Sequence, residues 1–171
     1  MDPAIVRFDP EIEPLVRLLE QTPRERLFEE VAARIKKGLT YQETLAALLL
    51  AGIRNVQPRP SVGFKFHAVL VVHSAHLVAL ASPEADRWLP IFWALDQFKR
   101  SQATDVREGD WTMRAVDPKG LPSTVSPARA FTTAMDEWDE SRADAAAASL
   151  ARGLTPGDVF EMFARYAARD F

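Results

Sequence analysis

The chain has 171 residues, which corresponds to about one domain and is long enough to bury a sizeable hydrophobic core. Apolar residues make up 47%, charged residues 26%, and the formal net charge is −3. This composition argues against wholesale disorder and against a global basic field for nucleic acid. The absence of cysteine excludes disulfides, thiolate nucleophiles and cysteine-ligated metals. No secretory signal and no membrane-length apolar run is visible, so we expect a soluble, cytoplasmic protein with neither a membrane nor a nucleic-acid partner.

Three helices are predicted in the first third of the chain, over residues 10–20, 23–38 and 41–56. The second of them has apolar residues at helical spacing and closes with two lysines and a glycine, a common way to end a helix. The third begins at Thr40, and Glu43 follows three residues later, which is the pattern of a capping box. These signals are local and predict two consecutive helices joined by a short connection.

A breaker segment at residues 57–63 contains two prolines and a glycine. The next segment, 64–81, continues without a breaker and is rich in alanine, so it is predicted as a helix. This helix is apolar on nearly every side, and we therefore expect it to be buried. A further helix is predicted over residues 84–102, with a kink at Pro90.

Residues 103–126 contain two prolines and two glycines and are predicted to form a long loop. A long helix over 128–153 follows, and then a last helix over 158–171 that is capped by Thr155. The predicted fold class is all-α: antiparallel helical hairpins packed as a bundle or array. We expect about seven helices, no substantial sheet and a single domain over residues 1–171.

Two segments of the chain, residues 30–56 and 145–171, align with each other without a gap. One explanation is an internal duplication, because a fixed spacing is the usual mark of a repeat. The other is shared capping chemistry, since helical hairpins commonly use glycine to stop and a Thr-x-x-acid pattern to restart. If the duplication is real, the chain is an N-terminal portion of a longer protein, or a partner chain supplies the rest.

The three histidines, His67, His73 and His76, lie within ten residues of one another. On a helix His73 and His76 share a face, whereas His67 lies about 120° from His73 and about 180° from His76. Neutral imidazole is the commonest metal ligand, so the three are candidate metal ligands. The alternative is that they are core histidines bonded to backbone carbonyls or acids.

The following helix supplies a candidate carboxylate and aromatic residues. Asp96 lies within an apolar stretch and would be a metal ligand or an acceptor that orients a histidine ring. The alternative is a surface ion pair with Lys99 or Arg100. Three aromatic side chains flank the histidines and would line an apolar pocket: Phe66, Trp88 and Trp93.

The segment 64–102 resembles the questin oxidase-like family in the pair Phe66-His67, the later His76 and the aromatic helix that follows. The resemblance implies an all-helical oxidoreductase that acts on polyketide-like aromatic compounds, with a non-haem iron held by several histidines in some relatives. This sequence has only three histidines and is much shorter than such enzymes. A site of many histidines would therefore need residues beyond this chain.

The first hypothesis is a metal-dependent oxidoreductase, or part of one, that uses a non-haem metal, with iron favoured, on a small apolar or aromatic molecule. The alternative is a non-catalytic helical repeat module that binds a protein or an apolar ligand. A third hypothesis, a DNA-associated regulatory domain, would need a basic face on one helix. A homo-oligomer or a missing second half would complete a site that one copy leaves open.

Overall fold

The computed structural model describes residues 5–57, 67–116 and 126–168, and the chain divides into two compact units, Met1–Arg114 and Ala115–Phe171. Each unit has its own cluster of buried apolar side chains. The sequence pattern was consistent with one domain over the whole chain, whereas the contacts define two units, and each is described by itself below.

The all-α prediction is confirmed. The described ranges contain eight α-helices and a short 3₁₀ helix, one α-helix more than predicted, and their only β pairing is an isolated bridge between Ile5 and Arg114. None of the helices in these ranges is long and apolar enough to cross a membrane.

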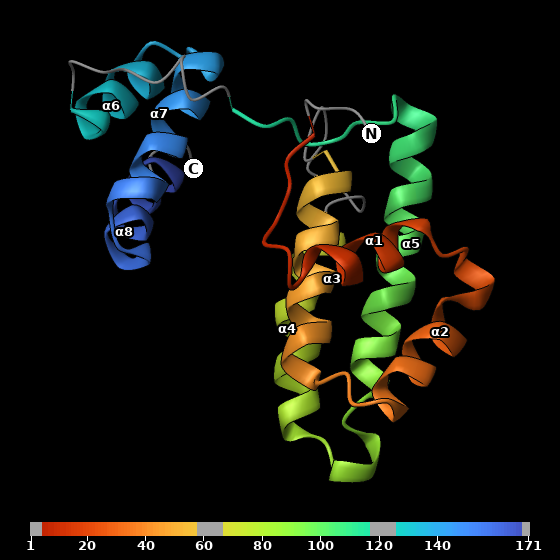
Figure 1. Cartoon of the computed structure of the whole chain (residues 1–171). Helices are drawn as coiled ribbons and strands as arrows, with labels where there is room; N and C mark the ends of the chain where they lie inside the picture. Colours follow the sequence, from red (N-terminus) through yellow and green to blue (C-terminus); the bar gives the residue numbers. More distant parts are fainter. Residues whose placement is uncertain (1–4, 58–66, 117–125, 169–171) are drawn as a thin grey trace. The chain divides into compact units, whose positions relative to one another are not determined.

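The larger unit is a bundle in which α3, α4 and α5 pack on one another, with α1 against α3 and α2 against α5 (Figure 1). Its helices are α1 (Glu13–Gln21), α2 (Arg24–Lys36), α3 (Tyr41–Asn55), α4 (His67–Ala81), the 3₁₀ helix η2 (Glu84–Asp86) and α5 (Leu89–Glu108). The predicted capping box opens α3: the Glu43 amide donates to Thr40 Oγ1 over 3.2 Å, and the Thr40 amide donates to Glu43 Oε2 over 2.8 Å.

Close contact between α3 and α4 depends on Gly52. A Cβ at this position would lie 2.9 Å from the Ala68 carbonyl oxygen and 3.2 Å from Val69 Cγ2. The first of these atoms belongs to the backbone of α4 and cannot rotate away, so any larger residue would push the two helices apart. Gly52 therefore sets how closely α4 approaches α3.

Two sequence predictions about α5 are wrong. The helix starts at Leu89, after η2, so Pro90 lies in its first turn instead of kinking its interior. Proline is well tolerated there because the first helical amides have no partner inside the helix. The helix also continues through the first residues of the predicted loop to Glu108, and it ends at Gly109, whose φ is +142°.

The smaller unit contains α6 (Pro127–Asp136), α7 (Glu140–Gly153) and α8 (Pro156–Ala167). The prediction of one long helix over 128–153 is wrong. Trp138 has a φ of +55°, and the side chain of Asp139 accepts a hydrogen bond from the Arg142 amide over 3.0 Å, which starts a new helix. The buried side chains of this unit are Phe131, Ala134, Ala146, Leu150 and Tyr166.

The two aligned segments share one feature and differ in another. Both hairpins restart with a capping box, from Thr40 in one and Thr155 in the other. Gly38 lies beyond the end of α2 with a φ of +105°, whereas Gly153 is the last helical residue of α7. Capping chemistry accounts for the shared feature, and the duplication stays a prediction.

Candidate functional site

The histidines of α4 lie in two different grooves, as their helical spacing predicts. His67 lines a groove of about 380 Å³ against α5, whose wall includes Trp93 and Arg100. His73 and His76 line a groove of about 280 Å³ against α3. Only His73 and His76 therefore share a site, and we call it the α3–α4 groove. Its lining residues are Gln42, Leu45, Ala46, Leu49, Val69, Val72, His73 and His76.

His76 is held by a residue that the sequence did not single out. Its Nδ1 lies 2.9 Å from the hydroxyl oxygen of Tyr41, the first residue of α3. Burial raises the pKa of Tyr41, and the positive charge of Arg87 partly opposes that effect. Trp88 packs edge-on against the Tyr41 ring at 5.5 Å between centroids, so this predicted pocket residue supports the tyrosine. No local sequence signal connects Tyr41 with a histidine 35 positions later.

Asp96, the candidate carboxylate, pairs neither with a histidine nor with a neighbouring cation on its own helix. Asp96 accepts two hydrogen bonds from Arg24 of α2, over 2.6 and 2.9 Å, instead of pairing with Lys99 or Arg100. Within residues 5–57, 67–116 and 126–168, no group of three or more histidine or acidic side chains is arranged to hold a metal ion. Phe66, the remaining predicted pocket residue, lies outside the described residues.

Lys99 is buried at the end of α1. Its Nζ donates to the carbonyl oxygens of Leu19 and Glu20, over 3.2 and 2.9 Å, and to Oε1 of Gln102 over 2.6 Å. Burial lowers the pKa of Lys99, and the negative charges of Glu20 and Glu25 partly oppose that shift. Because the last carbonyls of a helix have no partner inside it, Lys99 caps α1.

Among the residues that the structure describes in the larger unit, the most buried charged side chain is Arg54, in the last turn of α3, with 1% of its surface exposed. Its Nε and Nη2 donate to both oxygens of Glu20 over 2.7 and 2.9 Å, and its Nη1 donates to Glu13 over 2.8 Å. The guanidinium carbon also lies 4.8 Å from the centroid of the Phe8 ring. The arginine is therefore fully paired, and it ties α3 to α1 and to the segment before α1.

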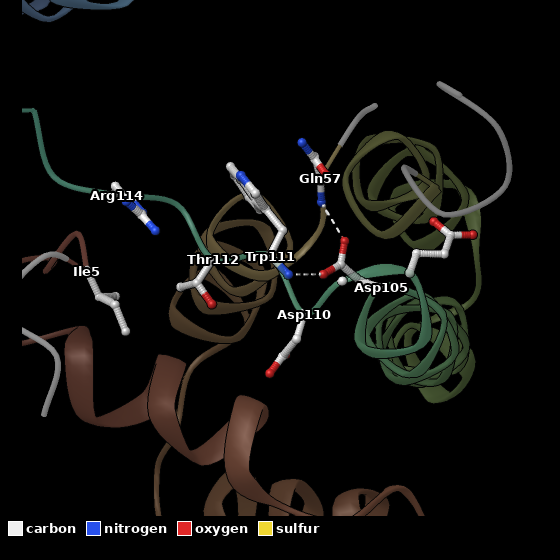
Figure 2. A pocket seen from close by; sticks show the side chains of 9 residues that line it. Ile5, Gln57, Asp105, Asp110, Trp111, Thr112 and Arg114 are labelled. Carbon is white, nitrogen blue, oxygen red and sulfur yellow. Dashed lines mark hydrogen bonds between the residues drawn. The ribbon is translucent and has the colours of Figure 1, made fainter. Parts of the chain in front are cut away.

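A polar pocket of about 320 Å³ lies at the C-terminal end of α5 (Figure 2). Asp105 has 2% of its surface exposed. Its carboxylate accepts a hydrogen bond from the backbone amide of Gln57 over 2.9 Å and another from the backbone amide of Trp111 over 2.8 Å. Figure 2 shows its carboxylate between these two amides. The carboxylate thus joins the chain leaving α3 to the turn after α5, and this is a structural role.

The outward surface of α4 contradicts the expectation that this helix is buried. Leu70, Leu77 and Leu80 are each 53% exposed, and His73 is exposed between them. We call these four residues the outer α4 face. The helix consists only of Ala, Val, Leu, His and Ser, so it carries no carboxylate, lysine or arginine. Its opposite side is buried through Ala68, Val71, Val72, Ala75 and Ala79.

No protein-family model matches the chain, and comparisons with curated proteins and with solved structures find no match either. The resemblance to the questin oxidase-like family therefore stays a prediction. The geometry of the site has to carry the functional argument.

Proposed function

We propose that the chain is a non-catalytic helical module that binds an apolar helix of a protein partner on the outer α4 face. One observation carries this proposal: the most apolar helix of the larger unit leaves Leu70, Leu77 and Leu80 more than half exposed. Exposed apolar residues that gather on one surface are typical of a protein-binding site. An apolar helix is the natural occupant, because a groove between two helices accepts side chains at helical spacing.

The α3–α4 groove beside this face supports the same occupant. Its lining contains aliphatic side chains, Gln42 and the two histidines, and none of these residues is a carboxylate, a lysine or an arginine. A highly charged ligand would find no opposite charge there. Leu49, which is 37% exposed on α3, extends the apolar surface across the groove.

The test is binding of a fluorescently labelled amphipathic peptide with a single leucine face, followed by fluorescence anisotropy. We expect saturable binding to the wild-type chain and a loss of at least roughly 30-fold in affinity for Leu77→Glu, because a carboxylate would be buried against the leucines. Val106→Glu is the matched control, since Val106 is 55% exposed on α5 and lines neither groove of α4. Equal binding by all three proteins would contradict the proposal.

A metal-dependent oxidoreductase is the second candidate, because His73 and His76 line one groove and form a pair that could chelate a metal. Its test is metal analysis by plasma mass spectrometry of the wild-type chain and of the double variant His73→Ala/His76→Ala. Near-stoichiometric iron, manganese or zinc that the double variant loses would establish the metal site. Equal metal content in the two proteins would refute these residues as ligands.

A further inference from the structure

We propose that the partner is a second copy of this chain, and that the two copies pair through antiparallel α4 helices. This inference rests on the proposed function, because it names the occupant of the outer α4 face. The four residues of that face, at positions 70, 73, 77 and 80, are separated by three, four and three residues. This is the spacing of the contact positions in paired helices, where each side chain fits between residues of the facing helix.

The residues of this face favour an antiparallel over a parallel arrangement of two copies, because parallel copies would place His73 opposite His73. The intervals read the same in both directions, so a reversed copy brings Leu70 opposite Leu80 of the second copy and His73 opposite its Leu77. A two-fold symmetric interface requires a surface that is complementary to itself, and this pattern meets that requirement.

The charges around the face allow two copies to approach. α4 contains no carboxylate, lysine or arginine, and on α3 no charged residue lies between Glu43 and Arg54. Glu43 is engaged in the capping box, and Arg54 is buried against Glu13 and Glu20. Pairing of two α4 helices therefore brings no like-charged carboxylates, lysines or arginines of this helix together.

The available area predicts a weak dimer. A helix of 15 residues is about 22 Å long, and α4 with the near halves of its two neighbours is roughly 20 Å wide, which gives about 450 Å² per copy in projection. Stable interfaces bury about 800 Å² per partner, so the dimer belongs to the small, concentration-dependent class. Val78 on α4 and Trp93 on α5, which are 55% and 51% exposed, are further exposed apolar side chains of these two helices.

Sedimentation equilibrium of the full chain over a concentration series tests the inference. We expect a monomer–dimer equilibrium that Leu77→Glu weakens by at least roughly 30-fold, since the new carboxylate would be buried at the interface. His73→Leu should strengthen the dimer because it makes the outer α4 face entirely apolar. Val106→Glu should have the same dimer affinity as the wild type. Circular dichroism confirms that each variant folds, and Leu77 tolerates the change because it is 53% exposed.

The outcomes separate this inference from the proposed function. A dimer from which an excess of the leucine-faced peptide displaces one copy supports both. A wild-type chain that stays monomeric throughout the series but binds the peptide overturns the second copy as partner and leaves the helix-binding function in place. A dimer that Leu77→Glu does not weaken overturns the interface.

Discussion

Two neighbouring helices of the larger unit reverse the usual rule of burial. The last turn of α3 buries Arg54 to 1% exposure, whereas α4, which contains no carboxylate, lysine or arginine, leaves Leu70, Leu77 and Leu80 each 53% exposed. This difference in burial follows from the groups that contact each side chain. Arg54 has two carboxylates that satisfy it, whereas none of the helices that the structure describes in this unit covers the leucines. Residue type alone therefore does not decide burial here, and the exposed apolar face is the basis of the proposed partner site.

Removing the buried charge should give the largest effect. Arg54→Met should lower the free energy of unfolding by about 3–5 kcal/mol, because it leaves Glu13 and Glu20 partly buried without their cation. Urea denaturation followed by circular dichroism measures the loss. The combined variant Arg54→Met/Glu13→Gln/Glu20→Gln should recover part of it, since no unpaired charge remains. A loss below about 1 kcal/mol for Arg54→Met would mean that the pairing does not hold α3 and α1 together.

The second prediction concerns the contact that positions α4 against α3. Gly52→Ala should destabilise the chain by about 1–3 kcal/mol, because the new methyl group would lie 2.9 Å from a backbone oxygen of α4. Gly153→Ala is the matched control: no atom lies within 4 Å of its added Cβ, and alanine there should stabilise the chain by about 0.4–1 kcal/mol. Thermal unfolding measures whether each variant is less or more stable than the wild type. The same sign for both variants would contradict the close approach of the helices.

A smaller effect is expected from acid. Burial alone would raise the pKa of Glu13, but hydrogen bonds from Arg54 and from the Phe8 amide, with the charges of Arg54 and Arg17, lower it below its ordinary value of 4.5. A carboxyl group whose pKa is lowered by folding stabilises the native state above that ordinary value and loses the contribution as pH falls through the folded pKa. Urea midpoints between pH 7 and low pH should therefore fall less steeply for Glu13→Gln than for the wild type. If the urea midpoints of Glu13→Gln and of the wild type fell equally with pH, the pairing of Glu13 with Arg54 would be contradicted.

The sequence predicted the features that depend on neighbours along the chain. The capping boxes at Thr40 and Thr155 and the all-α fold follow from local patterns, and the structure contains them. The break at Trp138 was missed, because a single residue with positive φ inside a helical pattern leaves no periodic signal. Local rules are therefore sufficient for most helices and fail at this turn and at the two ends of α5.

The candidate site depended on contacts between distant residues, and there the sequence was less informative. Asp96 lies next to Lys99 and Arg100 in sequence, yet its partner is Arg24, 72 positions away. His76 is held by Tyr41, 35 positions earlier. The apolar composition of α4 predicted burial, but composition does not say whether the covering surface belongs to the same chain.

The antiparallel pairing of α4 can be tested most directly with spin labels, because the chain contains no cysteine and a single introduced thiol can be labelled uniquely. Ser74→Cys and Ala81→Cys are suitable sites, since both residues are exposed on α4. The proposed dimer places the two Cα atoms about 10 Å apart at position 74 and about 20 Å apart at position 81. Electron paramagnetic resonance should therefore show strong dipolar broadening at position 74 and weak broadening at position 81. Equal broadening at both sites, or none at either, would contradict the proposed pairing.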